Sequence, residues 1–223
     1  HELAPGLDQE VGNYGVADQR PSLTNVTLKW ASGDPWIYFL LTEQAATNLY
    51  RIDVKGNKEL LIKGEQVVFE YSPAVGGNVA YGLADPSSPG DIYIWEQGKS
   101  SCLTDLNPWL RDHWLATPEM YWFDAGQGEK VHAWLMKPPG FDEKRKYPLV
   151  LYVHCSMFSW DFNHEFQSLA NAGYLVAYFN AIGTTAGYGQ AWTVASEGDQ
   201  GGRDYEQTMV GVDELIARGY VDE

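Results

Sequence analysis

The chain has 223 residues, of which 44% are hydrophobic, 14% aromatic and 20% charged, and its formal net charge is −15. A chain of this length and composition can bury a hydrophobic core, and its composition is not that of a disordered protein. The excess of acidic residues disfavours binding to nucleic acid or to an anionic membrane surface, because few cations are present to neutralise phosphates.

The first half of the chain predicts short strands. Residues 1–20 are polar and Gly-rich and predict a loop. From residue 24 to about residue 123, β-type runs alternate with turn signals about every ten residues, which is typical of an antiparallel meander, a sandwich or a propeller. The predicted strands are Val26–Trp30, Trp36–Leu41, Asn48–Ile52, Val67–Tyr71, Asn78–Gly82, Asp91–Trp95 and Tyr121–Phe123.

Two stretches in this region, residues 36–62 and 78–104, resemble each other. Each has a strand, a loop, a Leu-Tyr or Ile-Tyr strand, a glycine turn and a further strand containing leucine. The period of about 43 residues is the size of a propeller blade. We therefore predict that residues 1–120 form the C-terminal part of a β-propeller, although two such blades cannot close the ring.

The tryptophans and cysteines of the chain predict packing rather than chemistry. The tryptophans at issue are Trp30, Trp36, Trp95, Trp109, Trp114, Trp122 and Trp134. They favour a blade core over a sugar-binding surface. Cys102 and Cys155 fall in different predicted domains, so we expect two reduced, mostly buried thiols rather than a disulfide.

After Pro118 the pattern changes to alternating strands and helices. Residues 130–137 alternate as a strand does, and the unbroken apolar run Leu149–Val153 fits a strand that is buried on both faces. A predicted helix, His164–Asn171, and a second buried strand, Tyr174–Phe179, follow. This order is typical of a doubly wound α/β sheet.

The strongest predicted helix spans Arg203–Arg218. Its apolar positions recur as one continuous stripe, and Gly219 follows where a left-handed residue commonly ends a helix. The stripe consists of Tyr205, Met209, Val212 and Ile216.

Several segments of the second half resemble the beginning of the hydrolase domain in prolyl oligopeptidase-family serine peptidases, and most of all the acylaminoacyl-peptidase and dipeptidyl-peptidase-like branch. They are residues 131–142, 146–154, 164–167, 172–174, 187–189, 201–206, 211–213 and 217–222. The resemblance covers about residues 125–223, whereas the propeller-like part agrees only in kind. It implies an α/β fold, with the propeller blades followed by the N-terminal half of an α/β-hydrolase domain over residues 121–223.

The resemblance also implies where the catalytic residues belong. The family's serine lies in a Gly-x-Ser-x-Gly turn directly after the strand that would follow Asp222, with the aspartate and histidine further on. This chain contains no such motif: near Ser196, Val194 stands where the first glycine is required. We interpret Ser196 as a surface or helix-end residue, and we expect the nucleophile, acid and histidine to lie beyond Glu223.

Two departures from the family pattern concern the oxyanion loop. The family has a His-Gly-Gly-Pro-type loop after the first buried strand, whereas here His154 runs directly into Cys155, as though three residues were deleted. Ile182 stands where the family usually has an arginine. His154 and Cys155 are therefore candidates for an oxyanion loop that holds its donors poorly.

Other kinds of site are disfavoured. No positioned base supports Cys155 as a nucleophile. The helix that begins at His164 lacks the second histidine of a zinc helix, so we expect no metal and no cofactor. Gly201–Asp204 lacks the Lys-Ser/Thr pair of a phosphate loop and is explained as a helix N-terminus.

The leading hypothesis is a portion of a serine-type peptidase that hydrolyses short peptides through an acyl-enzyme in the complete protein, the 223-residue chain itself being inactive. The alternative is a non-catalytic binding or interaction module derived from such a peptidase, and a lipase- or esterase-type hydrolase is less favoured. The expected partners are a peptide substrate and, through the incomplete sheet, a second copy of the chain, but not nucleic acid or membrane. A cytoplasmic location is favoured, and a periplasmic or secreted one stays open because the chain does not begin with Met.

Overall fold

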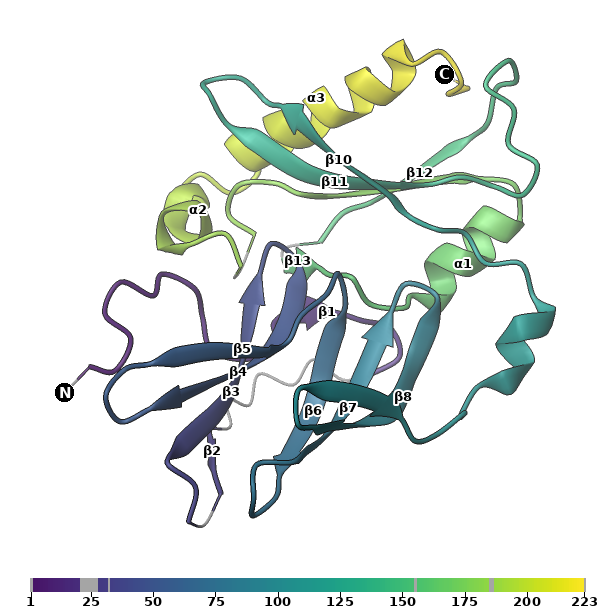
Figure 1. The fold of residues 1–223 in the computed structure, drawn as a ribbon. Coiled ribbons are helices and arrows are strands. Elements are labelled where there is room, and N and C mark those ends of the chain that lie inside the picture. The colour runs from purple at the N-terminus through teal and green to yellow at the C-terminus, as the bar shows by residue number, and fades with distance from the viewer. Residues whose placement is uncertain (1, 21–27, 32, 155, 185–186, 223) are drawn as a thin grey trace.

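Two large sheets make up most of the molecule, and the strands of the lower sheet run toward the upper sheet (Figure 1). The computed structural model describes residues 2–20, 28–31, 33–154, 156–184 and 187–222. Within this described part, the lower sheet contains eight strands and the upper sheet four. No helix among these residues is long and apolar enough to cross a bilayer.

The lower sheet consists of two antiparallel meanders of four strands each. The first contains β2 (Lys29–Trp30), β3 (Trp36–Glu43), β4 (Ala46–Asp53) and β5 (Lys58–Ile62). The second contains β6 (Val67–Pro73), β7 (Val79–Asp85), β8 (Ser88–Glu96) and β9 (Lys99–Cys102). A single parallel pair, Thr47 with Val67, joins them.

The predicted meander is confirmed, and the strands equated by the repeat occupy equivalent places. β3 and β7 are each the second strand of their meander, and β4 and β8 are each the third. The hairpin between β3 and β4 turns through Gln44 (φ 46°) and Ala45 (φ 71°). Positive φ at both central residues matches the twist of a tight hairpin.

Two packing predictions for this half need correction. Trp36 and Trp95 pack against the meander core as predicted, but the exposed tryptophans are Trp30, Trp109, Trp114 and Trp122. Cys102 is exposed rather than buried, because β9 is the outermost strand and every residue in it faces solvent. Cys155 lies outside the described residues.

The upper sheet has the strand order β10 (Glu119–Asp124), β11 (Lys130–Met136), β14 (Leu175–Asn180) and β12 (Leu149–Tyr152). β12 and β14 are parallel neighbours, with Leu149 opposite Leu175. The prediction that the two apolar runs lie in one parallel sheet is thus confirmed. However, β12 is only half-buried, because in the described chain it is the last strand of the sheet.

The helices cover opposite faces of the upper sheet. α1 (His164–Asn171) packs with Trp134 and Tyr178 on the face toward the lower sheet, and α3 (Arg203–Ala217) packs with Leu135 and Ala177 on the other. This is the doubly wound arrangement that the sequence predicts. Gly219 has φ +91° after α3, as its predicted role in ending the helix requires.

The buried face of α3 agrees with the predicted stripe only in part. Val212 and Ile216 pack against the core as predicted, but the fully buried residues are Gln207, Gly211 and Leu215, and Tyr205 is 60% exposed. Gly211 allows the close approach, because a Cβ there would lie 2.7 Å from the Phe179 ring. The helix is therefore rotated relative to the prediction.

The turn of the β3–β4 hairpin and the N-terminal segment connect the two sheets. Gln44 N donates to Gly187 O (2.9 Å) and Trp160 N donates to Ala45 O (3.1 Å). Part of the predicted N-terminal loop forms β1 (Gly15–Val16), which pairs in parallel with β13 (Met157–Phe158). The remaining helices are short: η1 (Pro108–Asp112), α2 (Gln190–Thr193) and η2 (Val194–Ser196).

Candidate functional site

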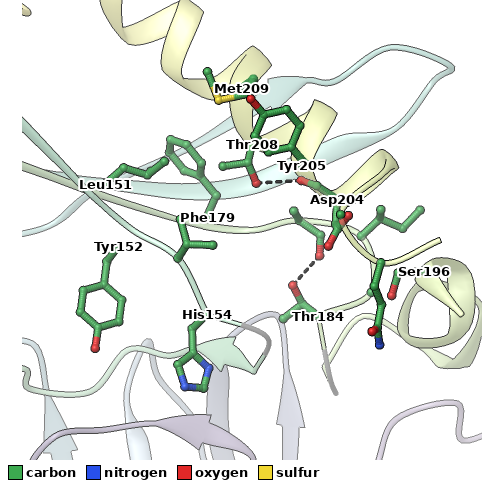
Figure 2. A pocket seen from close by; sticks show the side chains of 16 residues that line it. Leu151, Tyr152, His154, Phe179, Thr184, Ser196, Asp204, Tyr205, Thr208 and Met209 are labelled. Carbon is green, nitrogen blue, oxygen red and sulfur yellow. Dashed lines mark hydrogen bonds between the residues drawn. The ribbon is translucent and has the colours of Figure 1, made fainter. Parts of the chain in front are cut away.

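A cavity of about 600 Å³ opens at the carboxyl ends of β12 and β14, beside the first turns of α3 (Figure 2). Doubly wound sheets place their ligand sites at this edge, where the loops after parallel strands converge. The position of the cavity makes it the candidate functional site of the described chain.

The cavity wall is mainly apolar. Leu151 comes from β12, Phe179 from β14, Ile182 from the loop that follows β14, and Tyr205 and Met209 from α3. Tyr205 and Met209 belong to the stripe that the sequence predicts to be buried. They line this cavity, because α3 turns its neighbouring face, with Gln207, onto the sheet.

Two threonines in the wall have satisfied hydroxyl groups. Thr208 Oγ1 donates to Asp204 O (2.8 Å) within α3, and Thr184 Oγ1 donates to Ala181 O (Figure 2). Such bonds to the local backbone leave a hydroxyl less free to bind a ligand. The threonines are therefore structural parts of the wall.

Asp204 is the polar wall residue that the packing leaves unsatisfied. Its Oδ1 atom is buried and has no hydrogen-bond partner among the described residues. Asp204 lies in the first turn of α3, where the helix dipole favours a negative charge, as the sequence predicts. A buried, unsatisfied carboxylate oxygen costs free energy, so it is available to accept a hydrogen bond from a group that enters the cavity.

His154 lies just beyond the end of β12, after Val153, and lines the cavity. Ser156 N donates to His154 Nδ1 (2.9 Å). A neutral His154 that accepts through Nδ1 carries its proton on Nε2. Its neighbour in the predicted oxyanion loop, Cys155, lies outside the described residues, so the two candidates are placed only in part.

Ser196 is the last residue of η2 and is half-buried. It lies tightly against Gly183, where an added Cβ would be 2.0 Å from Ser196 Oγ. The hydrogen bonds of the described residues include none from the Ser196 hydroxyl to a histidine. Its place at the end of η2 agrees with its interpretation as a helix-end residue.

The loop after β14 is held by a polar contact that sequence reasoning missed. Gln207 Oε1 accepts from Ile182 N (2.8 Å), and Gln207 Nε2 donates to Glu129 Oε2 (2.8 Å). Glu129 also forms an ion pair with Arg203. Ile182, which stands where the family usually has an arginine, is 4% exposed. Nothing in the local sequence marks Gln207 as buried, because a polar residue on a helix usually faces solvent.

The cavity does not contain a complete catalytic arrangement. Within the described part of the chain, no serine or cysteine is hydrogen-bonded to a histidine that a carboxylate orients, and no group of three His, Cys, Asp or Glu side chains could hold a metal ion. The arrangement can bind an apolar group and offer it one carboxylate and one imidazole.

Comparisons with known proteins give the wider context. Residues 160–223 match the family described as the prolyl oligopeptidase family. The chain is 33% identical over 211 residues to a Bacillus subtilis protein named "uncharacterized peptidase YuxL", and 31% identical over 210 residues to dipeptidyl-peptidase 5 of Porphyromonas gingivalis. These alignments include 92% and 87% of this chain but 31% and 30% of those proteins.

Solved structures share the fold. Acylaminoacyl peptidase of Pyrococcus horikoshii superposes with a TM-score of 0.78 at 22% identity, over 96% of this chain and 32% of that one. Dipeptidyl peptidase 4 of P. gingivalis gives a TM-score of 0.72 at 21% identity, over 95% of this chain and 30% of that one. The chain thus spans about a third of the length of the proteins it matches.

Proposed function

Because this chain belongs to the prolyl oligopeptidase family of serine peptidases, we propose that it forms the part of such an enzyme that precedes the nucleophile. The complete protein hydrolyses short peptides through an acyl-enzyme. Residues 1–120 supply two propeller blades and residues 121–223 the first half of the hydrolase domain. The 223-residue chain alone has no peptidase activity.

One observation carries this proposal: the residues after α3 already pair beside β12. Tyr147 N donates to Tyr220 O and Asp222 N donates to Tyr147 O, both at 2.9 Å, so Val221 forms a parallel bridge with Tyr147. A strand that continues in this direction runs along the open edge of β12. Its carboxyl end reaches the cavity, which is where a nucleophile turn is needed.

The cavity residues take supporting roles in this proposal. The loop at His154 and Cys155 contributes to the oxyanion hole, whose donors must lie about 3 Å from the developing charge. Since the loop is short, we propose that its donors are displaced and that turnover is reduced on the order of a hundredfold or more.

Two experiments test the proposal. The purified 223-residue chain is incubated with aminoacyl- and peptidyl-nitroanilides, with and without a fluorophosphonate; turnover that the inhibitor blocks would refute the predicted inactivity. Reading the coding sequence past Glu223 tests the family role. A Gly-x-Ser-x-Gly motif within about fifteen residues supports the peptidase, because the nucleophile turn directly follows that strand.

A non-catalytic interaction module is the second candidate, and the open edge of β12 favours it. An unpaired strand edge is a template for pairing with another chain. If the chain is such a module, we expect the reading frame to stop without a nucleophile motif and the chain to associate with itself or another protein through β12. The length of the open reading frame separates the two candidates.

A further inference from the structure

His132 is a buried histidine that the proposed chemistry does not use. It lies on β11, is 2% exposed, and stacks on Trp122 of β10 with ring centroids 4.3 Å apart and an interplanar angle of 6°. On its own strand, the Trp134 ring is 4.0 Å away. An aromatic stack explains the burial of the ring but not the choice of a histidine.

The hydrogen bonds of His132 determine where its proton lies. Phe158 N donates to Asn180 Oδ1 (2.8 Å), which fixes the other amide atom as Nδ2. Asn180 Nδ2 is 2.8 Å from Tyr188 OH and can only donate, so the tyrosine hydroxyl accepts from it. The hydroxyl proton then points to His132 Nδ1 at 2.7 Å. We assign this direction, in which Nδ1 is unprotonated and neutral His132 carries its proton on Nε2, a buried atom without a partner among the described residues.

The tyrosine at the centre of this network belongs to a loop with two contacts. The loop follows β14 and leads to α2. Its first residues, 181–184, line the cavity. Near its end, Gly187 O accepts from Gln44 N at the turn of the β3–β4 hairpin (2.9 Å). Tyr188 is thus anchored between the cavity wall and the contact with the lower sheet.

We infer that His132 is a positioning residue: by accepting the Tyr188 hydroxyl proton it holds the described residues of this loop, 181–184 and 187–189, in place, and it releases this hold when it is protonated. A protonated imidazole donates from both nitrogens, so Nδ1 can no longer accept. The Tyr188 hydroxyl would then face a donor from Asn180 and a donor from His132. Its own proton would be left without an acceptor.

The surroundings of His132 support a switch rather than a fixed charge. Among the described residues, the groups that face it are Trp122 from β10, Trp134 from β11, Asn180 from β14 and Tyr188 from the loop, and of these only the tyrosine can ionise. Burial raises the pKa of Tyr188 above its ordinary value, so it stays neutral. Burial alone lowers the pKa of His132, to about 4. The loop is therefore held at neutral pH and released in acid.

Hydrogen exchange of the 223-residue chain tests the inference. The Gly183 amide, which donates to Trp192 O (3.0 Å), reports on the loop, and the Gly173 amide at the end of α1 is the internal control. Tyr188→Phe removes only the hydroxyl, and His132→Phe keeps a stacked ring without an acceptor. Each is expected to raise the exchange rate of the Gly183 amide roughly tenfold at pH 7, the equivalent of one lost hydrogen bond, without changing that of Gly173.

A pH series separates positioning from mere packing. The ratio of the Tyr188→Phe rate to the wild-type rate at each pH cancels the intrinsic dependence of exchange on pH. It is expected to fall to one as the pH drops below about 4, where His132 is protonated. His132→Asn, whose amide oxygen can accept near the position of Nδ1 without titrating, is expected to remove that inflection.

Two results would overturn the inference: exchange in the folded Tyr188→Phe chain within about twofold of wild type, or a wild-type ratio that is constant with pH. The importance of the loop for a peptide site rests on the proposed function. The hydrogen-exchange result is independent of that function, because the experiment does not measure peptidase activity. A chain that never hydrolyses a peptide would refute the proposed function and leave this result intact.

Discussion

The guanidinium of Arg20 binds both carboxylate oxygens of Asp161, a residue 141 positions later in the chain. Asp161 has a side chain that is 5% exposed and lies in the segment between β13 and α1, whereas Arg20 belongs to the N-terminal segment. Arg20 also stacks over the Phe69 ring at 4.2 Å and donates to Pro89 O, both in the lower sheet. One side chain thus ties three separate parts of the molecule together.

Replacing Arg20 with methionine is expected to lower the free energy of unfolding by about 3 kcal/mol, because it leaves a buried carboxylate without its partner. Adding Asp161→Asn should recover much of the loss, since an amide costs less to bury unpaired than a charge does. Urea denaturation of the two single variants and the double variant measures the coupling. Additive losses in the double variant would show that the ion pair does not act as a unit.

Folding excludes a proton from His132, which makes stability depend on pH. The pKa of His132 is lowered to about 4 from 6.5, so between these values the unfolded chain binds the proton first. The stabilisation that the folded state gains from keeping His132 neutral is present above pH 6.5 and is lost as the pH falls toward 4. From pH 7 to pH 5 the loss is roughly 2 kcal/mol by linkage.

His132→Phe is expected to remove this part of the pH dependence. The measurement compares urea denaturation of wild type and variant at pH 7 and pH 5, so that titration of the carboxylates cancels. Parallel losses in the two proteins would contradict the prediction.

The close approach of Gly183 to Ser196 predicts a costly substitution. Gly183→Ala places a Cβ 2.0 Å from Ser196 Oγ at a residue with φ +81°. The matched control is Gly173→Ala, which has φ +98° and no atom within 4 Å of the added Cβ. Backbone strain of about 1 kcal/mol is common to both, and the clash should raise the cost at Gly183 to about 3 kcal/mol.

The difference between these two alanine variants, measured by thermal or urea unfolding, isolates the contact. Ser196→Gly in the Gly183→Ala background should remove the extra cost of the clash. The backbone strain that both alanine variants share should remain. Equal costs at the two glycines would mean that the segment containing Ser196 moves away freely.

The open edge of β12 predicts that the chain associates with itself. Val153 follows this strand and is 68% exposed, and a charge beside an unpaired edge opposes pairing. Val153→Lys is therefore expected to shift sedimentation toward the monomer. Val75→Lys, at an 80% exposed residue in the turn before β7, is the control for the change in net charge. An equal shift in both variants would assign the effect to charge rather than to the strand edge.

Much of the fold was predictable because it depends on short-range patterns. Alternating apolar residues and glycine turns gave both meanders, and the ends of α1 agree with the prediction. The depth of burial was less predictable. β12 has an apolar run like that of β14, but β14 has neighbours on both sides and β12 has one. Burial depends on neighbours that a local pattern does not contain.

The composition of the candidate site was less predictable. His154 lines the cavity, and its role in an oxyanion loop stays a prediction. The unsatisfied Asp204, the loop contact of Gln207 and the Tyr188–His132 pair were missed, since each depends on a partner far away in the sequence. Polar residues on helices and strands are usually solvent-facing, so nothing local marked these as buried.

The sequence by itself determined the longer strands and helices, that two apolar runs make a parallel pair, and the family of the second half. The periods of apolar residues are set by backbone geometry, which acts over a few residues. Only the tertiary structure decided which face of α3 is buried, that Arg20 meets Asp161, and that His132 is enclosed by Trp122, Trp134 and Tyr188. These outcomes follow from the packing of distant segments, where the fit of side chains and the pairing of buried polar groups select one arrangement.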